Sequence, residues 1–329
     1  MTITESLLFL PTTLCGRLSF RLKLIGTALL FGLPLVAISL VHLAGQGERV
    51  ARVRAEQAAL AVHMPLLRLN ERVDAVHAAR LAAQRGSTDA QALVTAAAGE
   101  VEVLAAALGA AVPTDFAAAW RTPPGDDMSG HELAASALRA ALAENIERGG
   151  LRMDGQARSN ALLGLLADRL PPFVDALARA RRIGGEALAG QRLRPTQRRE
   201  LEAARAGFAS MQLWIDDGLA RGCPDAACPV LAAAQRRFDE TLLPFIESLT
   251  IHVIDAVDLG LPADEFLRRA DAVTAALLDL GDAAAAEAER LLAGRAAALD
   301  KRRSGVAVLL FGILLLIAWA FSGAYRSIV

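Results

Sequence analysis

The chain has 329 residues, enough for one large domain or two modest ones, and its formal net charge is −1. Hydrophobic residues make up 54% and charged residues 22%, and the mean hydropathy of +0.36 is too high for an ordinary soluble enzyme. The same apolar excess excludes intrinsic disorder, and the balanced charge excludes a basic field that would recruit nucleic acid. Alanine and leucine dominate the apolar share, which favours helices over sheets.

Two stretches without a formal charge, residues 24–44 and 305–324, account for much of the hydrophobicity. Each would rise ~30 Å as an α-helix, which is enough to cross the hydrocarbon core of a bilayer. A cleaved signal peptide is the alternative for the first stretch, because Arg17, Arg21 and Lys23 precede it, but its apolar run is longer than a usual signal core. We therefore predict two membrane-spanning helices.

The two spans divide the chain into five predicted parts. These are a cytoplasmic N-terminal tail (1–23), a first transmembrane helix (24–44), an extracytoplasmic helical domain (45–304), a second transmembrane helix (305–324) and a cytoplasmic stub (325–329). Basic residues flank both spans on both sides, and long loops cross a membrane largely regardless of their charge. The charge pattern therefore leaves the orientation open.

The sequence of residues 45–304 predicts a series of amphipathic helices. In the last of these helices, apolar residues alternate in steps of four and three, as in an a/d seam. The members of the seam are Phe266, Ala270, Val273, Leu277, Leu280 and Ala284. The first helix continues from the membrane span to Gly86 and Ser87. Others are expected at about 89–111, 131–147, 156–190, 196–220 and 229–258, with a longer connection around 113–127 and a bend at Pro171 and Pro172.

These patterns predict an all-α, two-span membrane protein with a long antiparallel helical bundle between the spans. A simple four-helix bundle needs about 150 residues or fewer, so seven helical segments leave room for two stacked modules of the four-helix-bundle type that share long helices. The first and last helices are joined to the spans. We expect these two helices to run side by side and to form the mechanical link to the membrane.

Cys223 and Cys228 flank a proline-bearing break between two helical patterns. They could close a small disulfide loop in an oxidising compartment, remain two free thiols, or supply half of a metal site. No further cysteine and no histidine cluster lies nearby in the sequence, so a metal is not expected.

Arg80, Arg85 and Arg181 are the candidate ligand-binding residues. Arg80 continues the apolar stripe of the first helix, Arg85 lies just over one turn further on, and Arg181 lies at or beside an apolar face. An inward-facing guanidinium must be paired, because burying an unpaired charge costs several kcal/mol. A small anion between two such arginines would satisfy both. The alternatives are pairing with carboxylates such as Asp74 or Asp175, or extension of the side chains to water.

Catalytic motifs are missing from the sequence. It contains no phosphate-binding glycine loop, nucleophile elbow or cyclase motif. His63, His77 and His131 are scattered without an i,i+4 pair, and His252 lies on the apolar stripe of its helix, where we expect a core histidine. We expect no enzymatic activity, no cofactor and no metal.

Several short motifs occur in an order found in a known class of receptors. They are Gln84-Arg85-Gly86-Ser87, Trp120, Gly150-Leu151-Arg152-Met153-Asp154, Leu170-Pro171, Arg181, Gly184, Arg295, Arg302-Arg303 and Gly323-Ala324-Tyr325-Arg326-Ser327. On these motifs nearly the whole chain resembles the helical sensor region of proteobacterial methyl-accepting chemotaxis proteins and of related membrane diguanylate cyclases and histidine kinases. In layout it is also similar to the nitrate- and nitrite-sensing and helical bimodular sensor domains.

The chain departs from this family pattern in three places. Gln84 stands where similar sensors often carry histidine, and Ser159 and Asn160 stand where relatives often place a serine and an aromatic residue. Such transducers continue past the second span into a HAMP linker and an output domain. We expect that output domain to be absent from this chain.

The resemblance implies the sensing region of a chemoreceptor-like transducer in the cell inner membrane, multi-pass, with the large loop in the periplasm. Such a region would act as a homodimer in the bilayer, detect a small ligand, with an anion as the candidate, or a partner, and transmit the signal through the two membrane helices. Two alternatives stay open: a membrane-anchored helical scaffold that binds a partner protein, and the truncated sensor half of a diguanylate cyclase. Nucleic acid is not an expected partner.

Overall fold

The computed structural model describes residues 20–87, 89–121, 129–152, 155–224 and 228–328. Over these residues every regular element is helical and no strand forms, which confirms the predicted all-α class. The chain divides into two compact units. Unit 1 comprises Met1–Val53 and Gly294–Val329, and unit 2 comprises Arg54–Ala293.

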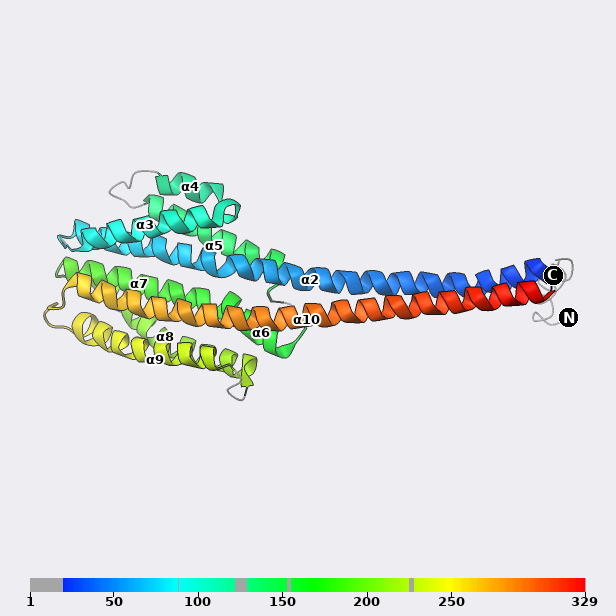
Figure 1. The fold of residues 1–329 in the computed structure, drawn as a ribbon. Helices are drawn as coiled ribbons and strands as arrows, with labels where there is room; N and C mark the ends of the chain where they lie inside the picture. The colour runs from blue at the N-terminus through cyan, green and yellow to red at the C-terminus, as the bar shows by residue number, and fades with distance from the viewer. Residues whose placement is uncertain (1–19, 88, 122–128, 153–154, 225–227, 329) are drawn as a thin grey trace, which may run out of the picture. The chain divides into compact units, whose positions relative to one another are not determined.

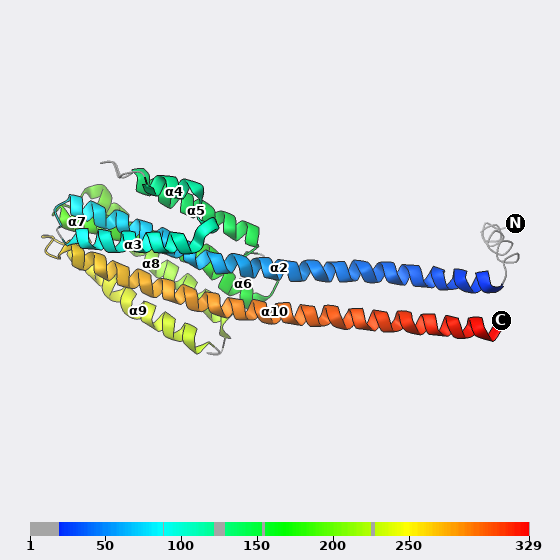
Figure 2. The ribbon, with the colours of Figure 1, turned by 45° about the horizontal axis from the view of Figure 1, so that its top comes forward.

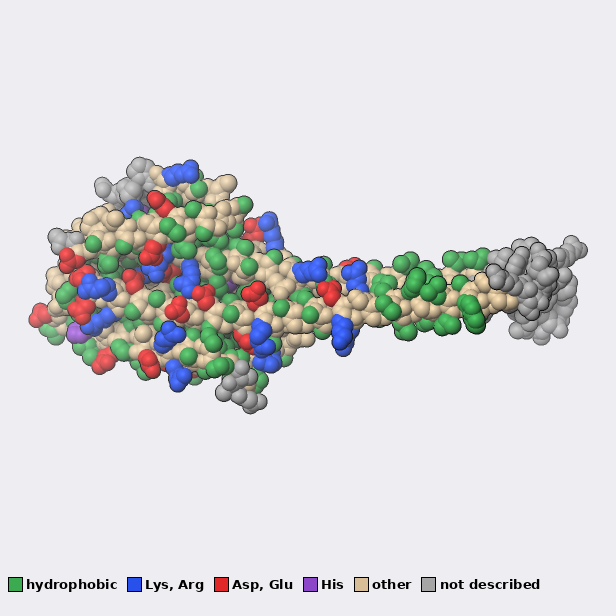
Figure 3. All heavy atoms as spheres, viewed as in Figure 1, with side chains coloured by type: hydrophobic (Ala, Val, Ile, Leu, Met, Phe, Trp, Pro, Cys, Tyr) green, Lys and Arg blue, Asp and Glu red, His purple; other side chains and the backbone are tan. Residues whose placement is uncertain are grey.

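Unit 1 contains the first part of helix α2 (Phe20–Gln84) and the last part of helix α10 (Ala263–Ile328). The two helices lie side by side in this unit in Figures 1 and 2. Their apolar side chains are exposed rather than buried, as at Val41 and Trp319, and Figure 3 shows hydrophobic side chains along this unit. Exposed apolar surface of this extent is typical of a membrane or protein contact.

Unit 2 contains the remaining described helices and the other parts of α2 and α10. In chain order these are α3 (Ala90–Leu108), the 3₁₀ turn η1 (Gly109–Ala111), α4 (Thr114–Arg121), α5 (Ser129–Gly149), α6 (Ala157–Gly164), the π-helical η2 (Leu165–Arg169), α7 (Leu170–Ala189), α8 (Pro195–Gly222), α9 (Pro229–Leu249) and the π-helical η4 (Thr250–Ile254). Three details differ from the expected helices. Helix α4 forms within the expected connection, the segment 156–190 is interrupted by η2, and the helical path through α9 and η4 ends at Ile254.

The interruption at η2 follows from the two prolines that begin α7. Pro171 and Pro172 lack backbone N–H groups, so they cannot donate the hydrogen bonds that would continue an α-helix through this point. The N–H of Leu170 instead bonds to the carbonyl of Leu165, the wider spacing of a π-helix. The sequence predicted a bend here, and the structure shows a π-helical turn at this position.

Two helical stretches among the described residues are long and apolar enough to cross a membrane, Ala263–Ala320 and Ala90–Ala111. The first includes most of the predicted span 305–324. The predicted span 24–44 lies in α2, and some of its side chains are outside the described part of the structure, so it stays a prediction. The stretch in α3 and η1 was not predicted as a span. It carries Glu100 and Glu102, and one of its faces is buried within unit 2.

A cluster of buried phenylalanines joins α7, α8, α9 and α10. Its members are Phe173, Phe208, Phe238, Phe245 and Phe266. Neighbouring rings have centroids between 5.5 Å and 6.4 Å apart, the range in which aromatic rings attract each other. Gly184 of α7 makes a close approach to α10 possible, because a Cβ at this position would lie 2.5 Å from the ring of Phe266.

Candidate functional site

Arg181 of α7 lies at the polar centre of unit 2 and is 1% exposed. Its Nη1 donates to Glu71 Oε1 of α2 at 2.7 Å and to Asp271 Oδ1 of α10 at 2.6 Å. Its Nη2 donates to the backbone carbonyl of Glu71 at 3.3 Å. One guanidinium therefore joins the two long helices to α7.

The charges around Arg181 keep it ionised in the interior. Burial by itself would lower the pKa of Arg181, but the carboxylates of Glu71 and Asp271 raise the pKa above its ordinary value. Glu71 is fully buried, and its second oxygen lies 3.0 Å from Nε of Arg72, which also pairs with Glu100 of α3. Charge-assisted bonds of this kind offset the cost of burying the ions only while every partner is present.

Arg80 belongs to a second cluster, formed by α2, α4 and α5. Its Nη1 donates to Nε2 of His131 at 2.8 Å, so this ring nitrogen must act as an acceptor. The ring centroid of His131 lies 5.5 Å from that of His77 and 5.6 Å from that of Trp120. The rings of Trp120 and His131 meet edge-on. Burial, aided by nearby arginines, lowers the pKa of both His77 and His131 to about 4. Both rings are neutral at physiological pH.

Arg85 lies at the surface, with 54% of its side chain exposed. Its Nη2 donates to Glu186 Oε1 at 2.9 Å, and Arg194 donates to the same oxygen at the same distance. The structure thus gives Arg80, Arg85 and Arg181 three separate sets of partners and does not bring them together. Their role in ligand binding stays a prediction.

The partners of Arg181 are residues that sequence reasoning missed. Asp74 and Asp175 were examples of carboxylates that could pair with the arginines in the alternative to an anion site, whereas Glu71 and Asp271 make the bonds to Arg181. Asp271 directly follows Ala270 of the predicted seam, and this adjacency was the one sign in the sequence that Asp271 lies near the interior. His63 Nε2 donates to the carbonyl of Leu166. His252, which was expected in the core, is instead partly exposed and lines a hollow beside α9.

Cys223 and Cys228 are joined by a disulfide, with their Cα atoms 6.1 Å apart. The bridge connects the end of α8 to the start of α9, where Pro229 occupies the first helical turn. Residues 225–227 between them lie outside the described residues. In the part of the chain that the structure describes, no group of three or more histidine, cysteine or acidic side chains could hold a metal ion.

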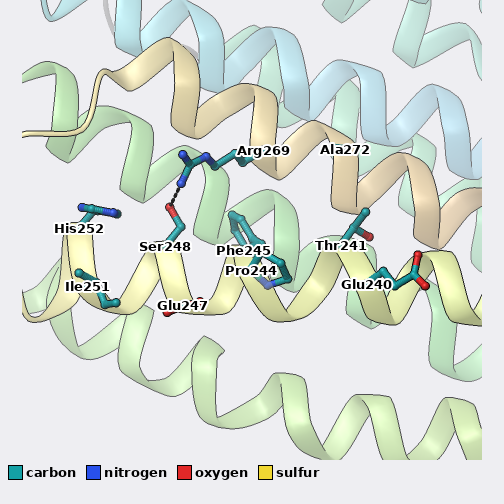
Figure 4. A pocket seen from close by; sticks show the side chains of 10 residues that line it. All are labelled: Glu240, Thr241, Pro244, Phe245, Glu247, Ser248, Ile251, His252, Arg269 and Ala272. Atoms are coloured by element: carbon teal, nitrogen blue, oxygen red, sulfur yellow. Dashed lines mark hydrogen bonds between the residues drawn. The ribbon is translucent and has the colours of Figure 1, made fainter.

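A hollow of about 510 Å³ lies between α9 and α10 (Figure 4). Phe245 lies in its middle, and Arg269 points from α10 toward Ser248, to which its Nη1 donates at 3.0 Å. Arg269 also pairs with Glu265. Because Glu240 and Glu247 line the same hollow, its charged groups give no clear preference for a cation or an anion.

Comparisons with protein-family models, with curated protein sequences and with solved structures gave no match for this chain.

Proposed function

We propose that the chain is the sensing region of a membrane-bound signalling receptor in the inner membrane. In this proposal residues 45–304 form an antiparallel helical bundle in the periplasm, and two copies of the chain form a homodimer. The bundle detects a small ligand or a partner, and helices α2 and α10 pass the resulting change across the membrane.

The observation that carries this proposal is the set of bonds around Arg181. Its partners Glu71 and Asp271 belong to α2 and α10, and both helices continue into unit 1, where their apolar side chains are exposed. A displacement of α7 that moves Arg181 therefore acts on both of these helices at once. Receptors commonly signal through helix shifts of about 1–2 Å, which a ligand stabilises by binding one arrangement better than the other.

Reporter fusions test the proposed orientation. A reporter inserted between residues 122 and 128, which lie outside the described residues, should be active in the periplasm and inactive in the cytoplasm. A fusion after Val329 should give the opposite result and serves as the control. If the inserted reporter is active only in the cytoplasm, the sensor proposal is wrong.

A fusion of the full chain to a reporter output module tests the signalling role. Arg181→Met should change the basal output by about threefold or more, because it removes the bonds between α7 and the two long helices. Arg148→Ala is the control, since Arg148 is exposed and pairs with Glu144 within its own helix. Membrane fractions probed for each variant show that it is inserted. An inserted Arg181→Met variant with unchanged output would contradict the proposal.

A membrane-anchored scaffold is the second candidate, and one surface favours it. A hollow of about 550 Å³ lies beside α3, lined by Leu278 of α10, by small and apolar residues of α3 and by the charged Arg68, Arg72 and Glu100. Val103 in this lining is 69% exposed. Such a surface is typical of contacts between proteins. If Val103→Glu abolishes capture of a partner from membranes while Arg181→Met leaves reporter output unchanged, the scaffold replaces the sensor as the better explanation.

A further inference from the structure

A charged hollow of about 310 Å³ lies among helices α2, α5 and α7 of unit 2. We name it the arginine hollow, and its charged lining consists of Asp74, Arg139, Asp175, Arg179 and Arg182. Arg139 comes from α5, and the other two arginines lie three residues apart on one face of α7. Three arginine side chains from two helices therefore line one space, and those of Arg139 and Arg179 are also exposed to solvent.

The three arginines form no hydrogen bond or ion pair with the described residues, although Arg139 and Arg179 act electrostatically on the two acids. Asp74 and Asp175 form no such bond or pair there either, although all five side chains line the same space. Each guanidinium has five N–H donors in a planar arrangement that fits a carboxylate with two parallel bonds. The arginine hollow thus offers donors that the protein itself does not use.

The balance of charge in the arginine hollow is positive. Three arginines face two acids, and burial disfavours the ionised form of both acids. Burial raises the pKa of Asp74 to about 6, and it also raises the pKa of Asp175 despite the opposing effect of Arg139 and Arg179. The positive excess therefore grows as the pH falls through the mildly acidic range.

We propose that the arginine hollow binds a small organic anion with two or three carboxylates. Its volume corresponds to about ten water molecules, so a nitrate-sized ion would leave most of the space to water. An anion with separated carboxylates reaches Arg139 on α5 and the arginines of α7 at the same time. A metal ion does not fit this space, because three positive side chains would repel it.

The position of the arginine hollow links ligand binding to the long helices. Arg179 and Arg182 lie on either side of Arg181 in the sequence of α7, and Arg181 holds Glu71 of α2 and Asp271 of α10. An anion that draws α7 toward α5 therefore acts on the helix that carries Arg181. The idea that this anion is the signal rests on the proposed sensor function, whereas binding of the anion to the arginine hollow does not.

Calorimetry on the full chain in lipid nanodiscs tests the binding. The probes are succinate and citrate, with acetate and nitrate as comparators at about pH 7.5. We expect saturable binding of succinate or citrate, and binding of acetate and nitrate weaker by about tenfold or more, because a single small anion reaches fewer guanidinium groups. If neither succinate nor citrate binds, the proposal is wrong.

Variants of the lining locate the site. Arg139→Gln and Arg179→Gln should each weaken binding by about tenfold, whereas Arg148→Gln on α5 should leave it within about twofold of the parent chain. Circular dichroism shows whether each variant keeps its helical content and melting temperature. If folded Arg139→Gln and Arg179→Gln variants both bind like the parent chain, the anion does not occupy the arginine hollow.

The pH dependence of binding provides a further test. The charged groups that act on Asp74 are Arg181 and Asp175 of α7, Arg139 of α5 and Glu71 of α2. Since the Asp74 carboxylate repels an anion, binding should tighten as the pH falls from about 7.5 to about 5.5. Asp74→Asn should bind more tightly than the parent at the higher pH and show a smaller pH dependence. An unchanged affinity of Asp74→Asn at the higher pH would contradict the assignment.

Spin labels separate failure of binding from failure of the proposed function. Cysteines at the exposed positions Ala51 and Ala298, in a Cys15→Ser background, report the spacing of α2 and α10 within unit 1. Citrate binding with a changed spacing supports both proposals. Citrate binding without a change in spacing supports the arginine hollow and contradicts the signalling role. A lack of binding contradicts the arginine hollow alone.

Discussion

Helix α7 places its arginines in two opposite environments. Arg181 is enclosed and bonded to two carboxylates. Arg179 and Arg182, its near neighbours in sequence, line a hollow in which they form no hydrogen bond or ion pair with the described residues. A helix turns by about 100° per residue, so Arg181 points away from the face that the other two share. A buried arginine bonded to two carboxylates indicates a structural joint, while arginines that line one hollow without a hydrogen bond or ion pair among the described residues indicate a binding site. Stability and binding measurements on variants of these arginines test that distinction.

The largest effect is expected at Arg181. Arg181→Met should lower the free energy of unfolding by about 3–5 kcal/mol, because it leaves the buried carboxylate of Glu71 without its main partner. Arg139→Gln in the arginine hollow should change the free energy of unfolding by no more than about 0.5 kcal/mol. Denaturant unfolding of the full chain, followed by circular dichroism, measures both.

A triple variant controls for the lost packing at this site. When Glu71→Gln and Asp271→Asn are added to Arg181→Met, much of the lost stability should return, since no unpaired ion then remains in the interior. If Arg181→Met and Arg139→Gln are equally well tolerated, the distinction between the two regions of α7 does not hold.

The second expected effect concerns the packing of α7 against α10 close to Arg181. Gly184→Ala should cost about 1–3 kcal/mol, because the new Cβ would lie 2.5 Å from the ring of Phe266. Gly99→Ala in α3 is the matched control. No atom lies within 4 Å of its Cβ, so the higher helix propensity of alanine should stabilise the chain by up to about 1 kcal/mol. Equal effects of the two changes on the melting temperature would show that this part of α7 is loosely packed.

The helical class and most helix boundaries were predictable from the sequence, because each depends on the pattern within one segment. The seam from Phe266 to Ala284 and the break at Gly86 are of this kind. Helix α4 was missed because eight residues after Pro113 give too short a pattern to distinguish from a connection. The π-helical η2 was predicted only as a bend, since the prolines indicate where hydrogen bonds are lost but not how the backbone recovers them.

The pairing between helices was not predictable from a single sequence. Glu71, Arg181 and Asp271 come from three helices, and Asp74, Arg139 and Asp175 line one hollow from similarly distant parts of the chain. Periodicity shows which face of a helix is buried but not its register against a neighbour. The sequence therefore placed Arg181 at or beside an apolar face but did not identify Glu71 and Asp271 as its partners.

The third expected effect concerns the titration of Asp74, an acid of α2 that lines the arginine hollow. Its pKa is raised from 3.8 to about 6 in the folded chain, so the folded state binds a proton more strongly than the unfolded state. Its protonation therefore stabilises the fold fully below about pH 4, and this contribution is lost as the pH rises to about 6. Asp74→Asn should be more stable than the parent by about 1–2 kcal/mol at about pH 7.5 and nearly equal to it at about pH 4. A stability difference that does not vary with pH would contradict the raised pKa.

The smallest effect is expected at Arg85, which is neither enclosed nor directed into the arginine hollow. Its side chain is 54% exposed in the pair with Glu186, and pairs with such an exposed partner contribute about 0–1 kcal/mol that salt screens further. Arg194 and Gln197 also donate to Glu186, so this carboxylate keeps partners when Arg85 is removed.

Arg85→Ala should therefore lower the free energy of unfolding by no more than about 0.5 kcal/mol and leave citrate binding unchanged. Denaturant unfolding at low and high salt and calorimetry with citrate measure the two quantities. A loss of citrate binding in a folded Arg85→Ala chain would move the anion site to the sequence-predicted arginine and away from the arginine hollow. If Arg85→Ala leaves the affinity for citrate unchanged and Arg139→Gln weakens it, the ligand-binding arginines are those of α5 and α7 that line the arginine hollow.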